Sequence, residues 1–166
     1  RFEPGELDIN MLSSIVCSHE RGLAFIAAPP LPSYAEPLRP ELLASAFQLI
    51  KNQFDYIVAD LPHDFSDPAL QALDAADVIL MVATPDMASI RAVTAALDTY
   101  EKLGYPKEKI KLLLNATFPH SGLPREKIEA ALGTTAFAVM PYFQDVFVEA
   151  INSGQPVVLE RQKEAA

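Results

Sequence analysis

The sequence predicts an α/β fold, a three-layer sandwich built on a mostly parallel sheet. Two observations support this prediction. Short apolar runs recur along the 166 residues, separated by stretches of helical periodicity, and the runs are nearly continuous rather than alternating, as in strands buried on both faces. The connections between parallel strands joined by helices are right-handed and place helices on both sides of the sheet, so the pattern favours three layers. A chain of this length fits one domain, so we expect residues 1–166 to form a single α/β domain.

Five apolar runs are predicted to be central strands of that sheet. Each run is short, nearly continuous and rich in Val, Ile and Leu. In a parallel sheet their carboxyl ends would meet at one edge, where open α/β sheets bind ligands. In chain order the runs are LAFIAA (23–28), YIVAD (56–60), VILMVAT (78–84), IKLLLN (110–115) and AFAVM (136–140).

Helical periodicity fills the intervals between the strands. The clearest helix starts at Thr84-Pro85-Asp86, which offers helix-capping chemistry, and stops at Gly104, which suits a left-handed backbone. Its apolar face consists of Ile90, Val93, Leu97 and Tyr100. The other predicted helices are 7–19, a stretch with Leu43, Phe47 and Ile50 on one face, 67–75, 124–131 and 144–152. The proline-rich segment 28–41 is expected to be a stiff surface loop.

Composition limits the classes of function. The formal net charge is −9 and no cluster of Lys and Arg is found, so direct nucleic-acid binding, which needs a basic surface, is disfavoured. The single cysteine, Cys17, excludes an internal disulfide framework, and its apolar helical context predicts a small buried side chain rather than a reactive thiol. Nothing resembles a signal peptide or an apolar run long enough to span a bilayer. We therefore expect a cytoplasmic protein without membrane insertion.

One carboxylate stands at the end of a predicted strand. In FDYIVADLPHDF the strand delivers Asp60 to its tip, and Pro62 prevents regular structure from continuing. A carboxylate held rigidly beside phosphates suits Mg²⁺, but Asp and Pro are also ordinary terminators of buried strands, and the residues alone leave both interpretations open. Similarly, His63 with Asp64 and Asp67 is either a metal-binding cluster or, as we expect, a solvated loop.

The chain contains no phosphate-binding loop of its own. A nucleotide hydrolase needs a glycine-rich loop followed by Lys and Ser or Thr. The six glycines here are scattered, none is followed by lysine, and no GxGxxG fingerprint appears. We therefore assign no catalytic residue.

Five segments together resemble one family. They are similar to the deviant-Walker ATPases of the MinD and ParA type, and most closely to their pilus-assembly branch, the CpaE/TadZ proteins. The resemblance covers most of the chain from Gly22 to Leu159. It implies a P-loop NTPase-like fold in which this chain is the C-terminal part of the ATPase domain, lacking the strand of the phosphate loop. The segments are GLAFIAAPPLP, FDYIVADLPHDF, ALDAADVILMVATPDMASIRAVTAALDTYEKLG, KIKLLLNATFPHSG and VMPYFQDVFVEAINSGQPVVL.

The resemblance implies roles for four residues in binding ATP and Mg²⁺. Asp60 takes the position of an acidic residue linked to Mg²⁺, and the residues that follow it open the switch that senses the γ-phosphate. Asn115 takes the position that recognises adenine, and Pro141 with Tyr142 lies in the loop around the base. The family usually has a glycine soon after the aspartate, where this chain has Leu-Pro-His-Asp. ATP hydrolysis is expected only if an intact phosphate loop lies upstream of Arg1.

The function implied is the localisation or assembly of a pilus or secretion machine through nucleotide-linked dimerisation. The expected partners are a second copy of the protein, in a homodimer, and components of that machine. A ParA-type partitioning ATPase is the alternative, although the net charge of −9 disfavours DNA. MinD-type membrane recruitment calls for an amphipathic C-terminal helix, and LERQKEAA is short and mostly polar. A nucleotide-free α/β interaction scaffold is the remaining class. Because buried backbone groups need partners, absence of the phosphate-loop strand should leave a slot, a rearranged sheet or an associating surface.

Overall fold

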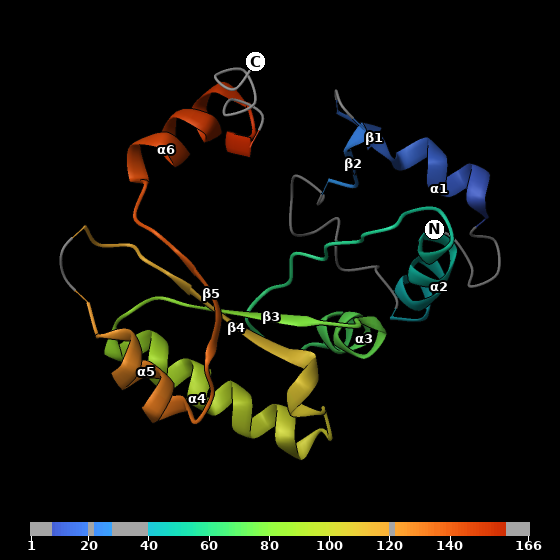
Figure 1. Ribbon diagram of the computed structural model, residues 1–166. Coiled ribbons are helices and arrows are strands. Elements are labelled where there is room, and N and C mark those ends of the chain that lie inside the picture. Colours follow the sequence, from blue (N-terminus) through green and yellow to red (C-terminus); the bar gives the residue numbers. More distant parts are fainter. Residues whose placement is uncertain (1–7, 20–21, 28–39, 120–121, 159–166) are drawn as a thin grey trace. The chain divides into compact units, whose positions relative to one another are not determined.

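The computed structural model describes residues 8–19, 22–27, 40–119 and 122–158, drawn in colour in Figure 1. The chain divides into two compact units, Arg1–Asp77 and Val78–Ala166. Most of the predicted proline-rich loop, and all of LERQKEAA, lie outside the described residues. None of the described helices combines the length and the apolar character needed to cross a bilayer. That residues 1–166 form one domain stays a prediction.

The second unit is built on a parallel sheet. Its strands are β3 (Ile79–Ala83), β4 (Ile110–Asn115) and β5 (Ala136–Met140), in the order β3-β4-β5 (Figure 1). Both pairings are parallel. Three predicted strands are therefore confirmed, as is the α/β class with a parallel sheet. Among the described strands β3 has only β4 as a neighbour.

Helices connect these strands. They are α4 (Met87–Lys102), the short 3₁₀ helix η3 (Lys107–Lys109), α5 (Arg125–Leu132) and, after the last strand, α6 (Gln144–Ser153). Each α-helix begins and ends within a few residues of its predicted bounds. Gly133 ends α5 and Gly154 ends α6, both with a left-handed backbone, the conformation that glycine adopts without steric strain.

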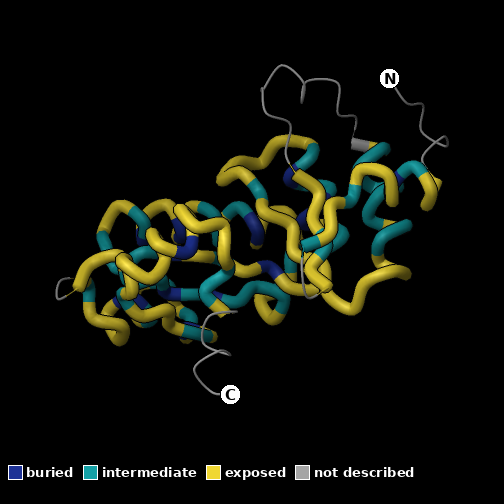
Figure 2. Tube along the Cα trace, turned by 90° about the horizontal axis from the view of Figure 1, so that it is seen from above, coloured by how far each residue is buried: buried dark blue, intermediate teal, exposed yellow. Residues whose placement is uncertain are grey.

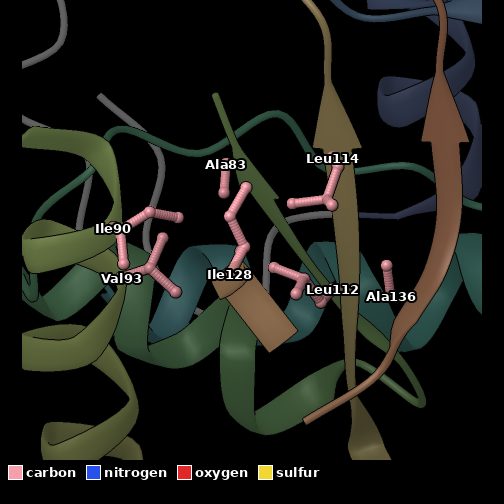
Figure 3. Close-up of a cluster of buried hydrophobic side chains, with 7 residues drawn as sticks. All are labelled: Ala83, Ile90, Val93, Leu112, Leu114, Ile128 and Ala136. Carbon is pink, nitrogen blue, oxygen red and sulfur yellow. The ribbon is translucent and has the colours of Figure 1, made fainter. Parts of the chain in front are cut away.

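The core of this unit lies between one face of the sheet and helices α4 and α5. Figure 3 shows its seven buried side chains. Ile128 of α5 is the largest of the fully buried residues, at 1% exposure. The predicted apolar face of α4 is confirmed, with three residues buried and Leu97 packed against the cluster. The cluster consists of Ala83, Ile90, Val93, Leu112, Leu114, Ile128 and Ala136.

The opposite face of the sheet carries exposed apolar side chains. Successive residues of a strand point to opposite faces, and in β3 the buried Ile79 and Ala83 alternate with Leu80 and Val82, which are 55% and 53% exposed. Exposed residues also cover much of the trace in Figure 2, where they are yellow.

The first unit is mainly helical. It contains α1 (Ile9–Ile15), α2 (Pro40–Lys51) and α3 (Asp67–Ala75), with a short hairpin of β1 (Cys17–Ser18) and β2 (Ala24–Phe25). Helices α2 and α3 contact each other. The Lys51 Nζ donates a hydrogen bond to the Ala75 carbonyl at 2.7 Å, which joins the C-terminal ends of the two helices.

The prediction for LAFIAA was wrong. Within the described part of this run, residues 23–27, the strand is limited to Ala24–Phe25, and it pairs antiparallel with β1 instead of joining the parallel sheet. The chain turns back on itself here, since the His19 amide donates to the Leu23 carbonyl at 2.7 Å. The hairpin also overturns the prediction for Cys17, because the predicted helix 7–19 ends at Ile15 and the thiol is exposed on β1.

The prediction of a strand at YIVAD was also wrong. Residues 54–66 form a coil between α2 and α3 (Figure 1). Tyr56 and Val58 are each 91% exposed. Apolar, β-branched composition favours a strand only where a neighbouring strand can accept the backbone hydrogen bonds. No described strand pairs with this segment.

Candidate functional site

The carboxyl ends of β4 and β5 bring three of the predicted residues to one edge of the sheet. Asn115 is the last residue of β4 and is in register with Met140, the last residue of β5. The Ala116 amide donates to the Met140 carbonyl at 2.9 Å, so the pairing continues one residue past the strands. Asn115 therefore lies beside the chain that enters Pro141 and Tyr142.

Tyr142 is the aromatic residue of this loop. It is half-buried, whereas Pro141 is exposed. The Tyr142 hydroxyl donates to Gln144 Oε1, at the start of α6, at 2.5 Å. The edge thus offers an aromatic ring, a proline ring and the amide of Asn115, which both donates and accepts hydrogen bonds. An apolar surface with a few fixed polar groups is typical of sites for planar organic ligands.

A register shift between β4 and β5 decides which side chains face this edge. Leu112 pairs with Ala136, but the next residue, Leu113, pairs with Ala138. Phe137 is therefore an extra residue in β5, a β-bulge. Because side chains alternate along a strand, one extra residue reverses the direction of all those that follow.

A hollow of about 310 Å³ lies at the same ends of the strands, within the second unit. It is mainly apolar, and Arg125 is the charged residue in its lining. None of the four predicted site residues lines it. The sequence signal for it is that several of its residues lie at or just after the ends of strands, namely Pro85, Leu114, Ala116 and Val139, whereas Ile128 comes from α5.

Gly122 allows a close approach of the chain beside this hollow. Its φ is +155°, and a Cβ there would lie 3.0 Å from the Pro85 ring. The Leu123 amide donates to the Pro85 carbonyl at 2.8 Å. A side chain at position 122 would therefore push apart two segments that are hydrogen-bonded to each other.

The turn from β3 into α4 is held by its own polar groups. Asp86 caps α4, and its Oδ1 accepts from the Ser89 amide at 2.9 Å. Its other oxygen accepts from the Thr84 hydroxyl. The hydrogen bond from the Thr84 hydroxyl is the larger cause, and the bond from the Ser89 amide the second, of a pKa of Asp86 below its ordinary value. The predicted helix start is confirmed, and both oxygens of this carboxylate serve it.

Asp60 lies in the first unit, exposed, within the coil that precedes α3. Asp64 is engaged locally, since its Oδ1 accepts from the Ser66 hydroxyl at 2.7 Å and from the Ser66 amide at 3.1 Å. The described residues contain no group of three His, Cys, Asp or Glu that could hold a metal. One carboxylate suits Mg²⁺ that keeps water and phosphate ligands, but alone it makes no metal site. No metal-dependent step follows from it.

Comparison with known sequences gives a family and several relatives. The model of a family described as cellulose biosynthesis protein BcsQ matches residues 35–163. The septum site-determining protein MinD of Thermotoga maritima is 29% identical over 129 residues, which are 75% of this chain and 47% of the relative. A putative MinD of Guillardia theta is 28% identical over 118 residues, 68% of this chain and 43% of the relative. The chain spans about half the length of the curated relatives it matches.

Solved structures show the same fold. A ParA family ATPase from Chlorobium tepidum superposes with a TM-score of 0.86 at 23% identity, covering 96% of this chain and 66% of the other. MinD of Pyrococcus horikoshii, solved in complex with Mg-ADP, gives 0.75 at 18% identity, covering 93% and 62%. The MinC:MinD complex of Aquifex aeolicus gives 0.75 at 22% identity, covering 91% and 62%.

Proposed function

The chain belongs to the family described as cellulose biosynthesis protein BcsQ, within the MinD/ParA superfamily, and from this premise we propose that it supplies the nucleotide-base end of an ATP-binding site. The observation that carries the proposal is the pairing of Asn115 with Met140, which brings Asn115 beside Pro141 and Tyr142. The Asn115 amide would bond the edge of adenine, while the rings of Pro141 and Tyr142 pack against its face.

The phosphate end of the nucleotide needs groups that this sequence lacks. The chain has no glycine-rich loop, and we propose that such a loop belongs to the full-length protein. Asp60 would then act beside Mg²⁺, the role that the resemblance of its sequence segment implies; a MinD with the same fold was solved in complex with Mg-ADP. Nucleotide held between two copies would favour the dimer, and its loss would change affinity for partners.

For the cellular role we propose localisation or assembly of a machine at the cell envelope. The matching family is named for cellulose biosynthesis and the relatives for septum-site determination. The resemblance of the five sequence segments to the CpaE/TadZ proteins supports a pilus or secretion machine in particular. The corresponding prediction is that the full-length protein co-purifies with components of such a machine in the presence of ATP and is released without it.

The alternative role is ParA-type partitioning, which the matching ParA fold also permits. Partitioning ATPases need a basic surface for nonspecific DNA binding, and the net charge of −9 opposes it. Salt-dependent binding of the full-length protein to duplex DNA in the presence of ATP would favour partitioning over envelope assembly.

Titration calorimetry with ATP and Mg²⁺ tests the nucleotide proposal. The 166-residue chain and the full-length protein are compared, each with the Asp60→Ala and Asn115→Ala variants. We expect strong binding by the full-length protein and weakening by both substitutions. Absence of binding in every form would leave a nucleotide-free interaction scaffold and return Asp60 to an ordinary loop residue.

A further inference from the structure

The first residue of β5 is held by two side chains of α5. The Ala136 amide donates to Glu129 Oε1 at 2.8 Å, and the Ala136 carbonyl accepts from Arg125 Nη2 at 3.3 Å. Arg125 Nε also donates to the same Glu129 oxygen at 2.7 Å. The amide and the carbonyl of Ala136 are thus bonded to the two members of one ion pair, Arg125 and Glu129, which lie one helical turn apart on α5.

This contact lies immediately before the β-bulge. Ala136 pairs with Leu112, and the extra residue, Phe137, follows at once. The extra residue of a bulge is not paired with the neighbouring strand. A contact that holds the residue next to the bulge therefore fixes where along β5 the register changes. On the amino-terminal side that residue is Ala136, held by Glu129 and Arg125.

The bulge in turn sets the far end of β5. With Phe137 extra, Val139 pairs with Leu114 and lines the hollow, and Met140 pairs with Asn115. Without it, each following side chain would point to the opposite face and the register with β4 would slip by one residue. The chain would then enter Pro141 displaced from Asn115.

We propose that Glu129, oriented by Arg125, is a positioning residue that fixes the bulge and so holds the loop of Pro141 and Tyr142 beside Asn115. Glu129 lies 12 residues before Pro141 in the sequence, and it bonds to the first residue of β5, the strand that leads into this loop. The inference rests on the proposed function only in its last step, where displacement of the loop lowers nucleotide affinity.

Hydrogen exchange of the Ala116 amide tests the positioning directly. This amide donates to the Met140 carbonyl, at the opposite end of β5 from Glu129. In the 166-residue chain, Glu129→Ala should speed its exchange about tenfold or more. Glu129→Gln keeps an oxygen acceptor for the Ala136 amide, so its exchange should stay within about threefold of the wild type. Glu126→Ala, which removes an exposed carboxylate from the same helix, is the matched control.

The same variants in the full-length protein test the consequence for nucleotide. We expect affinity for ATP to fall about three- to tenfold in Glu129→Ala and to be restored in Glu129→Gln, with circular dichroism unchanged. If Glu129→Ala does not fold, Arg125→Ala takes its place, because it removes the bond to the Ala136 carbonyl and the ion pair with Glu129 but leaves the Glu129 acceptor for the Ala136 amide.

The outcomes separate the two proposals. Ala116 exchange that is unchanged in a folded Glu129→Ala variant overturns the positioning role, whatever the nucleotide result. Faster exchange with unchanged affinity for ATP also overturns it, because the loop would then move without consequence. Failure of the wild-type protein to bind ATP defeats the proposed function, and the exchange comparison then decides the positioning role alone.

Discussion

Asn115 and Met140, the last residues of β4 and β5, lie in register, and the Ala116 amide bonds the Met140 carbonyl just beyond them. This pairing joins two strand ends, residues 115 and 140, that are 25 positions apart in the sequence. Because a backbone hydrogen bond makes this contact, it does not require the side chain of Asn115.

Substitution of Asn115 should therefore affect ligand binding more than stability. Asn115→Ala removes an amide that we propose bonds adenine, and a lost hydrogen bond of this kind corresponds to about 1.4 kcal/mol, or a tenfold weaker affinity. Calorimetry on the full-length protein measures this loss, with Asn152→Ala, at an exposed position of α6, as the control. Equal affinities of wild type and Asn115→Ala would remove Asn115 from the base site.

The buried side chain of Ile128 should contribute strongly to stability. It is 1% exposed and packs between α5 and the sheet (Figure 3). Ile128→Ala would leave a cavity and should lower the free energy of unfolding by about 2–5 kcal/mol. Ile151, which is 77% exposed on α6, provides a matched control, for which Ile151→Ala should change stability by about 0.5 kcal/mol or less. Urea midpoints of the two variants would be compared, and similar midpoints would contradict this packing.

The cap of α4 should make stability depend on pH. Hydrogen bonds from Thr84 and Ser89 lower the pKa of Asp86 from its ordinary value of 3.8. A lowered pKa in the folded state means that the stabilisation is complete above the ordinary value and is lost as pH falls through the lowered one.

Asp86→Asn tests this dependence, because it keeps an oxygen acceptor but cannot change its charge. We expect the urea midpoint of the wild type to exceed that of the variant at pH 7, and the difference to shrink as the pH is lowered below 3.8. Asp98→Asn, an exposed position within α4, should show no such trend. A constant difference between Asp86→Asn and wild type at all pH values would argue against the charged cap.

The parallel sheet could be predicted from the sequence because its strands find their neighbours within one unit. In IKLLLN and AFAVM the apolar run, the strand and the pairing all agree, and the edge rule for parallel strands brought Asn115 near Tyr142. YIVAD has the same composition, yet no described strand pairs with it. A single sequence states which residues suit a strand, but the neighbour that makes it one is a tertiary property.

The bulge and the hollow could not be predicted from the sequence, for a different reason. The bulge at Phe137 is set by bonds from Glu129 and Arg125 to the backbone of Ala136. Such bonds join side chains of one element to the backbone of another, and they leave no periodic pattern in the sequence. Even the open hollow has only an indirect signal, the position of Pro85 after a strand.

A side chain at Gly122 should lower stability through two effects, backbone strain and a steric clash. Its φ of +155° strains any other residue, and a Cβ would also lie 3.0 Å from the Pro85 ring, against the hydrogen bond from Leu123 to Pro85. Gly122→Ala should lower the free energy of unfolding by about 1–3 kcal/mol. Gly104 also has a positive φ, of +82°, but a Cβ there meets nothing within 4 Å. Gly104→Ala therefore measures backbone strain alone, and the larger loss expected for Gly122→Ala measures the contact with Pro85. If chemical denaturation gives Gly122→Ala the smaller loss, the close approach of the two segments is not maintained in solution.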